Sequence, residues 1–387
     1  MSGPLTGLRI IEMAGIGPAP YACMLLSDLG AEVIRIDRTS GGGLGGHPGD
    51  ITARGRKSIA VDLKQPDGVK LVLQLLESAD VLIECFRPGV MEKLGLGPED
   101  CAKRNPALVY GRMTGWGQDG PMAKRAGHDL NYIAITGLLD SFGTAGEAPP
   151  TPLNVIGDLG GGSMFLLLGV LAALLERKQS GIGQVIDAAI CDGTTSLLST
   201  IHGLRGIQFW DLEREQNMLD GGAPFYRSYL CKDGRSMSVG AIEPQFYAQL
   251  LAILDIDLGG SDYFSQMDKA QWPSRRAQMA ARFLEKSRDE WAVLFEGSDA
   301  CAAPVLDMEE AADYPHNAFR RNLVRRDNVL QSAPAPRFSR TPGEIQHSPV
   351  AEGANTIGIL NQLGLDADHI DRLLSAGVVK QVDGVNE

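Results

Sequence analysis

Strand-like and helix-like hydrophobic patterns alternate along the first 115 residues. Short apolar runs bounded by turn residues are typical of strands, and the segments between them have the length and spacing of helices. Helices of this length between strands imply βαβ crossovers, so we predict an α/β fold with a large Rossmann-like, mostly parallel sheet. Ligands of such sheets bind beyond the carboxyl ends of the strands. The predicted strands are 8–14, 31–37, 80–86 and 107–115, and the predicted helices are 20–30, 66–79 and 97–106.

The pattern changes near residue 221, where a second, smaller α+β domain is predicted. Asp233-Gly234 between two alternating runs strongly favours a β-hairpin. Residues 243–256 predict a helix with Pro244 in its first turn, where a missing N–H costs nothing. Two predicted helices within 358–379 pack back on the first domain. The predicted boundaries are 1–200 for the first part of the large domain, 201–222 for a linker, 223–325 for the small domain and 326–387 for the return segment.

Composition and charge exclude several classes of partner. The chain has 36 Lys and Arg against 48 Asp and Glu, a net charge of −12, so nucleic acid and anionic membranes are poor candidates as partners.

The cysteines and the apolar segments indicate the compartment. The six cysteines form no Cys-x-x-Cys pair, which argues against structural zinc and for a reducing compartment. The apolar run 164–175 is too short to span a bilayer and predicts a buried helix. With no recognisable targeting signal, we expect a soluble cytoplasmic protein.

The turn after the first strand resembles a dinucleotide-binding fingerprint, but incompletely. In "AGIGPAP" (14–20), Gly15 and Gly17 are followed by Pro20 where the third glycine belongs. Proline removes a backbone donor and cannot replace the close helix–strand contact of that glycine. Asp37 ends the second strand near the place of a ribose-binding acid. Binding of NAD is therefore the weaker interpretation.

A basic cluster lies on both sides of the glycine-rich segment 40–50. It is either a solvated face or a site for phosphates, for which the planar fork of arginine is well suited. A ligand with several phosphates, in a chain without a Walker motif or a complete dinucleotide fingerprint, points to coenzyme A among other candidates. The cluster comprises Arg35, Arg38, Arg54, Arg56, Lys57 and Lys64.

A lone histidine stands in "KRAGHDLNYIAITG" (124–137), and none of the six histidines pairs with another at a metal-ligand spacing. His128 is either a buried neutral imidazole or a proton-transfer residue with a partner elsewhere. The candidate partner is Asp158, which caps a helix, exchanges a proton, or does both. Proton donation would require burial that raises the pKa of Asp158. Glycines 160–162 would offer backbone N–H groups to an oxyanion at the start of this helix.

Nearly the whole chain resembles the family III coenzyme A transferases, the CaiB/BaiF superfamily. The "GxGQxGP" pattern and the Arg-Pro-Gly step are typical of the family as a whole. His128-Asp129, "GDLGGGSM" and "AIEPQFY" are similar to the branch that racemises 2-methylacyl-CoA thioesters. The stretches that carry the resemblance are 7–38, 87–99, 112–121, 126–133, 157–177, 221–226, 239–247, 335–343 and 358–379.

The resemblance implies a fold, a reaction and roles for particular residues. His128 and Asp158 would work as acid and base on opposite faces of the substrate α-carbon, through an enolate. Glu243 would support the histidine from the small domain of the partner subunit in an interlocked homodimer. The resemblance implies no metal and no cofactor beyond the CoA of the substrate, and a place in fatty acid metabolism. The CoA contacts would fall on Arg38, Val61, Asp62, Leu63, Lys64, Cys85, Phe86, Arg87, Lys93, Gly127, Asp129, Leu130, Asn131 and Tyr132.

Three positions depart from the pattern of the racemase branch. Cys85-Phe86 stands where Gly-Tyr is common, so bulk is added and a hydroxyl is lost before Arg87. Lys93 replaces an expected arginine, which keeps the charge but loses the bidentate fork. These departures concern ligand contacts and leave the class unchanged.

Two other functions compete with racemisation. In a CoA transferase, Asp158 would attack a thioester carbonyl and form an acyl anhydride, and CoA would pass between carboxylic acids. A CoA-binding scaffold without catalysis would keep the basic cluster but would not need Glu243 and His128 together. His128 separates the first two, because a transferase has no need of a base at the α-carbon.

Overall fold

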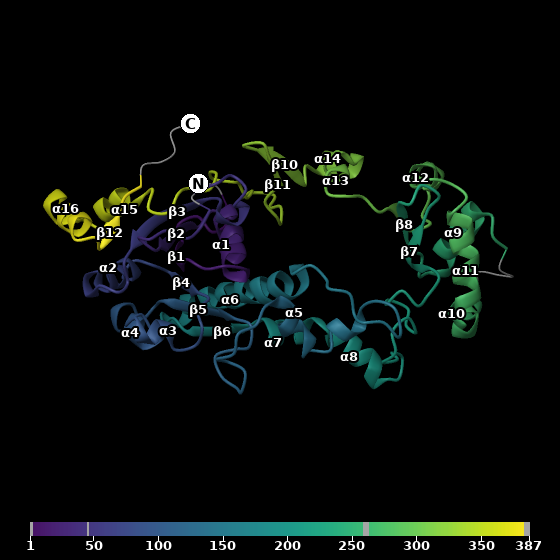
Figure 1. Ribbon diagram of the computed structural model, residues 1–387, viewed down its shortest axis with the longest axis horizontal. Coiled ribbons are helices and arrows are strands. Elements are labelled where there is room, and N and C mark those ends of the chain that lie inside the picture. Colours follow the sequence, from purple (N-terminus) through teal and green to yellow (C-terminus); the bar gives the residue numbers. More distant parts are fainter. Residues whose placement is uncertain (1–2, 45, 258–262, 383–387) are drawn as a thin grey trace. The chain divides into compact units, whose positions relative to one another are not determined.

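The computed structural model describes residues 3–44, 46–257 and 263–382 and divides the chain into two compact units. The sheet unit comprises Met1–Thr136, Pro152–Leu197 and His316–Glu387. The small unit comprises Gly137–Thr151 and Leu198–Pro315. Figure 1 shows the elements of each unit.

A seven-stranded sheet organises the sheet unit, in the order β12-β3-β2-β1-β4-β5-β6. Every neighbouring pair from β3 to β6 is parallel, and only β12 pairs antiparallel, which confirms the predicted α/β class and parallel sheet. Three strands of this sheet, β3, β6 and β12, were not predicted. The β3 sequence begins Arg-Lys-Ser and had suggested only a basic cluster. The strands are β1 (Arg9–Met13), β2 (Glu32–Asp37), β3 (Arg56–Val61), β4 (Val81–Glu84), β5 (Val109–Thr114), β6 (Val185–Ala189) and β12 (Val379–Lys380).

Helices cover both faces of this sheet, because successive strand residues point to opposite sides. Ile10 packs in one core and Ile11 in the other. One core includes α1 (Pro18–Asp28) and α6 (Met164–Ser180). The other contains the C-terminal helices, which confirms that the tail packs on the large domain. Its helices are α2 (Pro66–Leu76), α4 (Pro98–Arg104), α15 (Thr356–Gln362) and α16 (Ala367–Ser375).

A crevice is expected at the point where the strand order reverses, between β1 and β4. The backbone segments that follow these two strands lie very close together. A Cβ placed on Gly15 would lie 2.1 Å from the Cys85 sulfur, so no larger residue fits there. The incomplete fingerprint around Gly15 thus reflects close packing of two strand ends.

The small unit has a three-stranded antiparallel sheet, β7 (Tyr226–Leu230), β8 (Ser236–Gly240) and β9 (Ala302–Pro304). Asp233-Gly234 forms the predicted hairpin turn, with Gly234 at φ 79°. An aromatic core that includes Phe225 and Trp291 packs the sheet against its helices. These are mainly α9 (Pro244–Leu254), α11 (Trp272–Phe283) and α12 (Arg288–Phe295).

The unit boundaries differ from the predicted domain boundaries because of specific polar contacts. The segment predicted as a linker packs in the small unit, where Arg214 donates to the carbonyl oxygens of Phe142 and Glu147. Strand β11 (Val329–Ser332), which follows β10 (Leu323–Arg326), is fixed to the sheet unit. There, Arg54 donates to the Gln331 side chain and to the Ser332 carbonyl.

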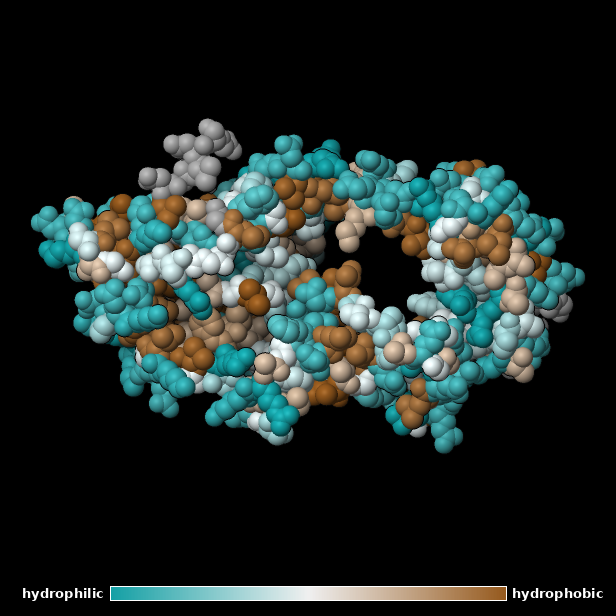
Figure 2. Space-filling view, in the orientation of Figure 1, coloured by the Kyte–Doolittle hydropathy of each residue, from teal (hydrophilic) through white to brown (hydrophobic). Residues whose placement is uncertain are grey.

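Helix α6 differs from its prediction in length and in exposure. With the π-helical turn before it, the helix spans Val155–Ser180, 26 residues that are long and apolar enough to cross a membrane by length and composition alone. Its inner face packs in the core of the sheet unit. The opposite face is an exposed apolar stripe, called the α6 face below. Figure 2 shows brown, apolar patches over the region of α5, α6 and α7. The α6 face comprises Met164, Leu168, Leu171 and Leu175.

Most of the predicted basic cluster is used inside the protein, so its interpretation as a phosphate site was wrong for four of the six cations. Two of the four pairs are fully buried. Arg38 and Lys64 are exposed and make no salt bridge with a described residue. The internal pairs are Arg54–Asp28 at 2.5 Å, Arg56–Glu12 at 2.7 Å, Arg35–Asp37 at 2.8 Å and Lys57–Glu32 at 2.6 Å.

We predict that Arg56→Met lowers the free energy of unfolding by about 3–5 kcal/mol, because it leaves the Glu12 carboxylate buried without its cation. Urea unfolding followed by fluorescence measures the change. Glu12→Gln in the same background should recover part of the loss. Lys70→Met is the control, since Lys70 and Asp67 form an exposed pair worth about 0–1 kcal/mol. Equal midpoints for Arg56→Met and Lys70→Met would refute the prediction.

Candidate active site

His128 stands at the start of a short helix and is exposed. It is the extended N-cap residue of α5 (Asp129–Ala134), and its N–H donates to the Asn131 side-chain oxygen at 3.1 Å. The interpretation of His128 as a buried core imidazole is therefore wrong for this chain. The side chain is placed where a ligand could reach it.

Asp158 lies within a π-helix, η3 (Val155–Ser163), which runs directly into α6. Hydrogen bonds between residues five positions apart define the π-helix. The Leu159 N–H donates to the Asn154 carbonyl, and the Met164 N–H donates to the Leu159 carbonyl. The helix therefore begins three residues before Asp158. Asp158 is not its N-cap, and the predicted capping role was wrong.

Glycines 160–162 lie inside this π-helix, so the prediction that they expose N–H groups at a helix start was also wrong. Their absent side chains instead allow α7 (Ile190–Leu197) to approach. A Cβ on Gly161 would lie 2.3 Å from the Thr194 hydroxyl oxygen, and one on Gly193 would lie 1.9 Å from the Gly161 carbonyl oxygen. The glycine run is required by packing.

The Asp158 carboxyl group is half-buried. Burial raises its pKa, while a hydrogen bond from the Asn154 side chain at 3.1 Å and the charge of His128 lower it, and burial is the stronger effect. Gly17, at φ 76°, lies beside it, since a Cβ there would be 3.6 Å from the Asp158 Oδ2. Gly17 and Asn154 were not predicted as site residues. The sequence did contain a signal for Asn154: in "NVIGD" (154–158) it stands four residues before Asp158, a spacing that places two side chains on one helix face.

Asp129 connects the two candidate acid–base residues. Its carboxylate is buried and accepts a hydrogen bond from the Asp158 backbone N–H at 2.7 Å. Burial raises the pKa of this carboxyl group as well. Because His128 is its neighbour in the chain, one side chain fixes the start of α5 to η3. Asp129 was predicted to contact CoA, but its carboxylate points to Asp158.

Tyr132 supports the turn that carries His128. Its ring packs edge-on against Trp116, with 4.7 Å between ring centroids, and its hydroxyl donates to the Gly127 carbonyl. A Cβ on Gly115 would lie 2.0 Å from this ring. The structure thus uses the Tyr132 side chain to hold the turn in place, and leaves Leu130 and Asn131 exposed on α5.

The other predicted CoA contacts follow the carboxyl ends of neighbouring strands. Arg38 follows β2, the 61–64 stretch ends β3, and the 85–87 stretch follows β4. Arg38, Lys64, Arg87 and Lys93 are exposed. Val61, Leu63 and Phe86 direct apolar side chains into or against the core, and Asp62 accepts a hydrogen bond from the Lys64 N–H. Burial raises the pKa of Cys85 to about 12, so its thiol stays protonated.

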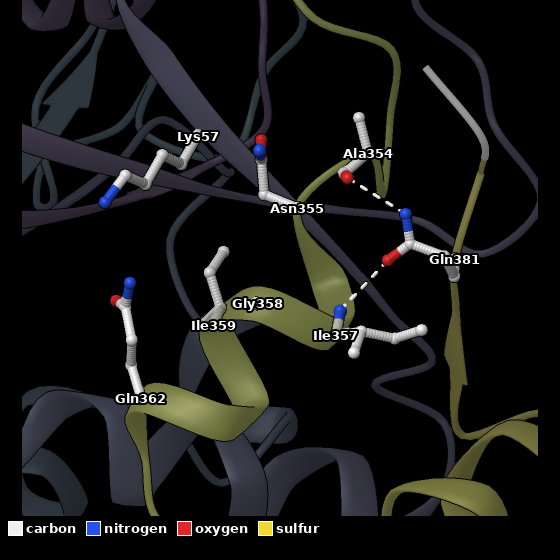
Figure 3. A pocket seen from close by; sticks show the side chains of 8 residues that line it. All are labelled: Lys57, Ala354, Asn355, Ile357, Gly358, Ile359, Gln362 and Gln381. Atoms are coloured by element: carbon white, nitrogen blue, oxygen red, sulfur yellow. Dashed lines mark hydrogen bonds between the residues drawn. The ribbon is translucent and has the colours of Figure 1, made fainter.

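A cavity of about 520 Å³ opens beside the Gly15–Gly17 turn and extends to Arg38 and the glycine-rich segment. A second cavity, of about 360 Å³, lies between β3 and α15 (Figure 3). The amides of Asn355 and Gln381 in the second cavity bond to the backbone, and Lys57 pairs with Glu32. Only the first cavity adjoins the turn beside Asp158.

Glu243 belongs to the small unit, where it is the exposed N-cap residue of α9. Within the described ranges, no three His, Cys, Asp or Glu side chains form a group that could hold a metal ion.

Comparison with known proteins gives consistent matches over most of the chain. Residues 5–356 match the model of CoA-transferase family III. The chain is 44% identical over 379 residues to the Mus musculus alpha-methylacyl-CoA racemase, and 40% identical over 381 residues to the Homo sapiens protein of that name, covering 97% of each chain in both cases. A crystal structure of a CaiB/BaiF family protein from Brucella suis has a TM-score of 0.80 at 25% identity, covering 94% of this chain and 100% of that one.

We predict that Asn154→Ala raises the pKa of Asp158 further, because the lost amide donor stabilises the ionised carboxylate. Carbon-detected NMR titration of the Asp side chains measures this pKa, and Asp158→Asn assigns the resonance. Asn361→Ala, at an exposed position of α15, is the control. An unchanged or lower pKa in Asn154→Ala would contradict the prediction.

Proposed function

The chain belongs to CoA-transferase family III, and we propose that within this family it racemises 2-methylacyl-CoA thioesters at the α-carbon by 1,1-proton transfer. The observation that carries the proposal is the link made by Asp129. It joins the turn of His128 to the π-helix of Asp158, whose pKa is raised by burial.

The chemistry requires two groups that exchange protons. A proton next to a thioester is weakly acidic, so its removal needs a base and a stabilised enolate oxygen. Neutral His128 removes the α-proton, and the electrons of the C–H bond enter the enolate. Asp158 in its protonated form then gives a proton to the opposite face. Burial supports the second step, because it keeps the Asp158 carboxyl group protonated to a higher pH.

Backbone groups of α5 are better placed for the enolate oxygen than glycines 160–162. The first N–H groups of a helix have no intrahelical partner. In α5 these belong to Asp129 and Leu130, directly after His128. A developing negative charge there would meet two donors beside the base that creates it.

Four exposed cations support binding of the CoA phosphates. Arg38, Lys64, Arg87 and Lys93 lie at or just beyond the carboxyl ends of β2, β3 and β4, the edge of the sheet where ligands bind. No described carboxylate pairs with any of them, so their charge is available in a protein that carries a net −12.

The transferase alternative fits this site less well. An aspartate that attacks a thioester must be ionised. Burial of Asp158 instead favours its protonated form. The alternative also gives no role to His128 or to the link through Asp129.

We further propose a homodimer in which the α6 face meets a second copy of the chain, and in which Glu243 of the partner's small unit supports His128. Four apolar residues at i, i+4, i+7 and i+11 form one stripe that costs free energy when left in water. A bilayer is the less suitable occupant, because the opposite side of α6 is core.

For the reaction, we predict that the parent protein incorporates solvent deuterium at the α-carbon of both enantiomers of a 2-methylacyl-CoA. His128→Ala and Asp158→Asn should each slow racemisation about 10²–10⁴-fold, the usual contribution of an acid–base group. NMR in deuterium oxide measures exchange on each face. His316→Ala is the matched histidine control.

The transferase alternative predicts a different result. His128→Ala would then keep most of the activity, and hydroxylamine would trap an acyl group on Asp158. Racemisation by His128→Ala at the parental rate would refute the proposed mechanism.

For assembly, we predict a particle of about twice 41.4 kDa, and a shift toward monomer in Leu171→Lys, because a charge on the α6 face opposes its burial. Sedimentation velocity over a dilution series measures both. Lys178→Glu, at the polar end of α6, is the control. An active monomeric parent would refute the dimer and the role of Glu243 across it.

A further inference from the structure

Arg112 begins the "RMTGWGQDGP" motif, and the proposed reaction gives it no role. It lies in β5, only 7% exposed, two residues after Tyr110. Residues two apart in a strand point to the same face of the sheet. Both side chains therefore reach toward the segment between β4 and α4.

The Arg112 guanidinium binds two carboxylates at once. Its Nε donates to Glu84 at 2.9 Å, and its terminal nitrogens donate to the two oxygens of Glu92 at 2.8 and 3.3 Å. Glu84 is fully buried at the end of β4, and its second oxygen accepts the Phe86 N–H at 2.7 Å. Glu92 lies in α3 (Val90–Lys93). Arg112 thus joins the end of β4, the turn after it and α3.

Tyr110 adds a second anchor to the same segment. Its hydroxyl donates to the Leu96 carbonyl at 2.9 Å, just beyond α3. Between the two anchors lie Arg87 and Lys93, two of the four exposed cations at the ligand edge. Neither cation pairs with a described carboxylate, so their positions depend on the backbone that carries them.

We propose that Arg112 is a positioning residue for substrate binding: it holds the turn after β4 and α3 so that Arg87 and Lys93 are placed for the phosphates of an acyl-CoA. The inference rests on the proposed function for the identity of the ligand. Arginine is required because its planar fork spans Glu84 and Glu92 together, whereas lysine is a point charge that neutralises the site without the fork. A segment already ordered before binding costs less to order on binding.

The test is a split between binding and turnover. We expect Arg112→Lys to raise the KM for a 2-methylacyl-CoA and the Kd for free CoA about tenfold, equivalent to the loss of one good contact. The kcat should change less than about twofold, since His128 and Asp158 lie on other segments. The KM for the matching acyl-pantetheine thioester, which lacks the nucleotide phosphates, should change little. Arg104→Lys, which makes the same change in an exposed pair with Glu77, is the matched control.

Two further variants separate positioning from folding. Glu92→Gln removes one arm of the clamp and should raise the same KM about threefold, a partial effect. Arg112→Met combined with Glu84→Gln leaves no unpaired buried charge, so the protein should fold, yet the KM for the CoA thioester should still rise. Circular dichroism and thermal unfolding establish that each variant is folded.

Two outcomes would overturn the proposal. One is an unchanged Kd for free CoA in a folded Arg112→Lys. The other is an equal loss of kcat/KM with the CoA and pantetheine thioesters. The Kd for free CoA is measured by calorimetry without turnover, so a parent that binds CoA but fails to exchange deuterium would refute the proposed reaction and leave the Arg112 test intact.

Discussion

Neutralisation of buried carboxylates at the strand ends is the constraint on which the sheet unit depends. Glu12 of β1 and Glu84 of β4 are fully buried on the two sides of the strand-order reversal. Ionised carboxylates without a cation would be very costly there, and Arg56 of β3 and Arg112 of β5 meet them from other strands of the sheet. Neither strand end can move without uncovering a charge. The backbone turns that leave β1 and β4 are therefore held where a ligand of this fold binds.

Beside this fixed edge, the protonation of the Asp158 carboxyl group depends on a competition between burial and polar contacts. Burial favours its neutral form, and Asn154 and His128 favour its charged form. The π-helix brings the carboxyl group to the Gly17 turn, while Asp129 holds its backbone. The glycine run lies inside this π-helix, where it serves packing. The glycines let α7 pack closely against the π-helix. Their role is therefore structural, and the residues around them carry the chemistry.

Local pattern was sufficient where a residue's state depends on near neighbours. Strands β1, β2, β4 and β5, the Asp233-Gly234 hairpin and the tail helices all followed from periodicity and turn chemistry. It failed at β3, whose Arg56, Lys57 and Ser58 look like a solvated basic segment. Their partners Glu12, Glu32 and Asp37 come from two other strands. Asp158 was misjudged for a related reason, because the π-helix starts earlier than the glycine run suggests.

The sequence by itself determined the fold class and the family, because these rest on local pattern and on motifs that persist along the chain, and the same motifs are the ground for proposing the pair His128 and Asp158. Only the tertiary structure decided which cations are free and where each polar side chain points. Arg56 meets Glu12 across 44 residues, and Asp129 meets Asp158 across 29. Pairing and burial at such separations are set by the packing of the sheet. That packing decides both whether the charge of an arginine is free for a ligand and how far the pKa of a carboxyl group is shifted.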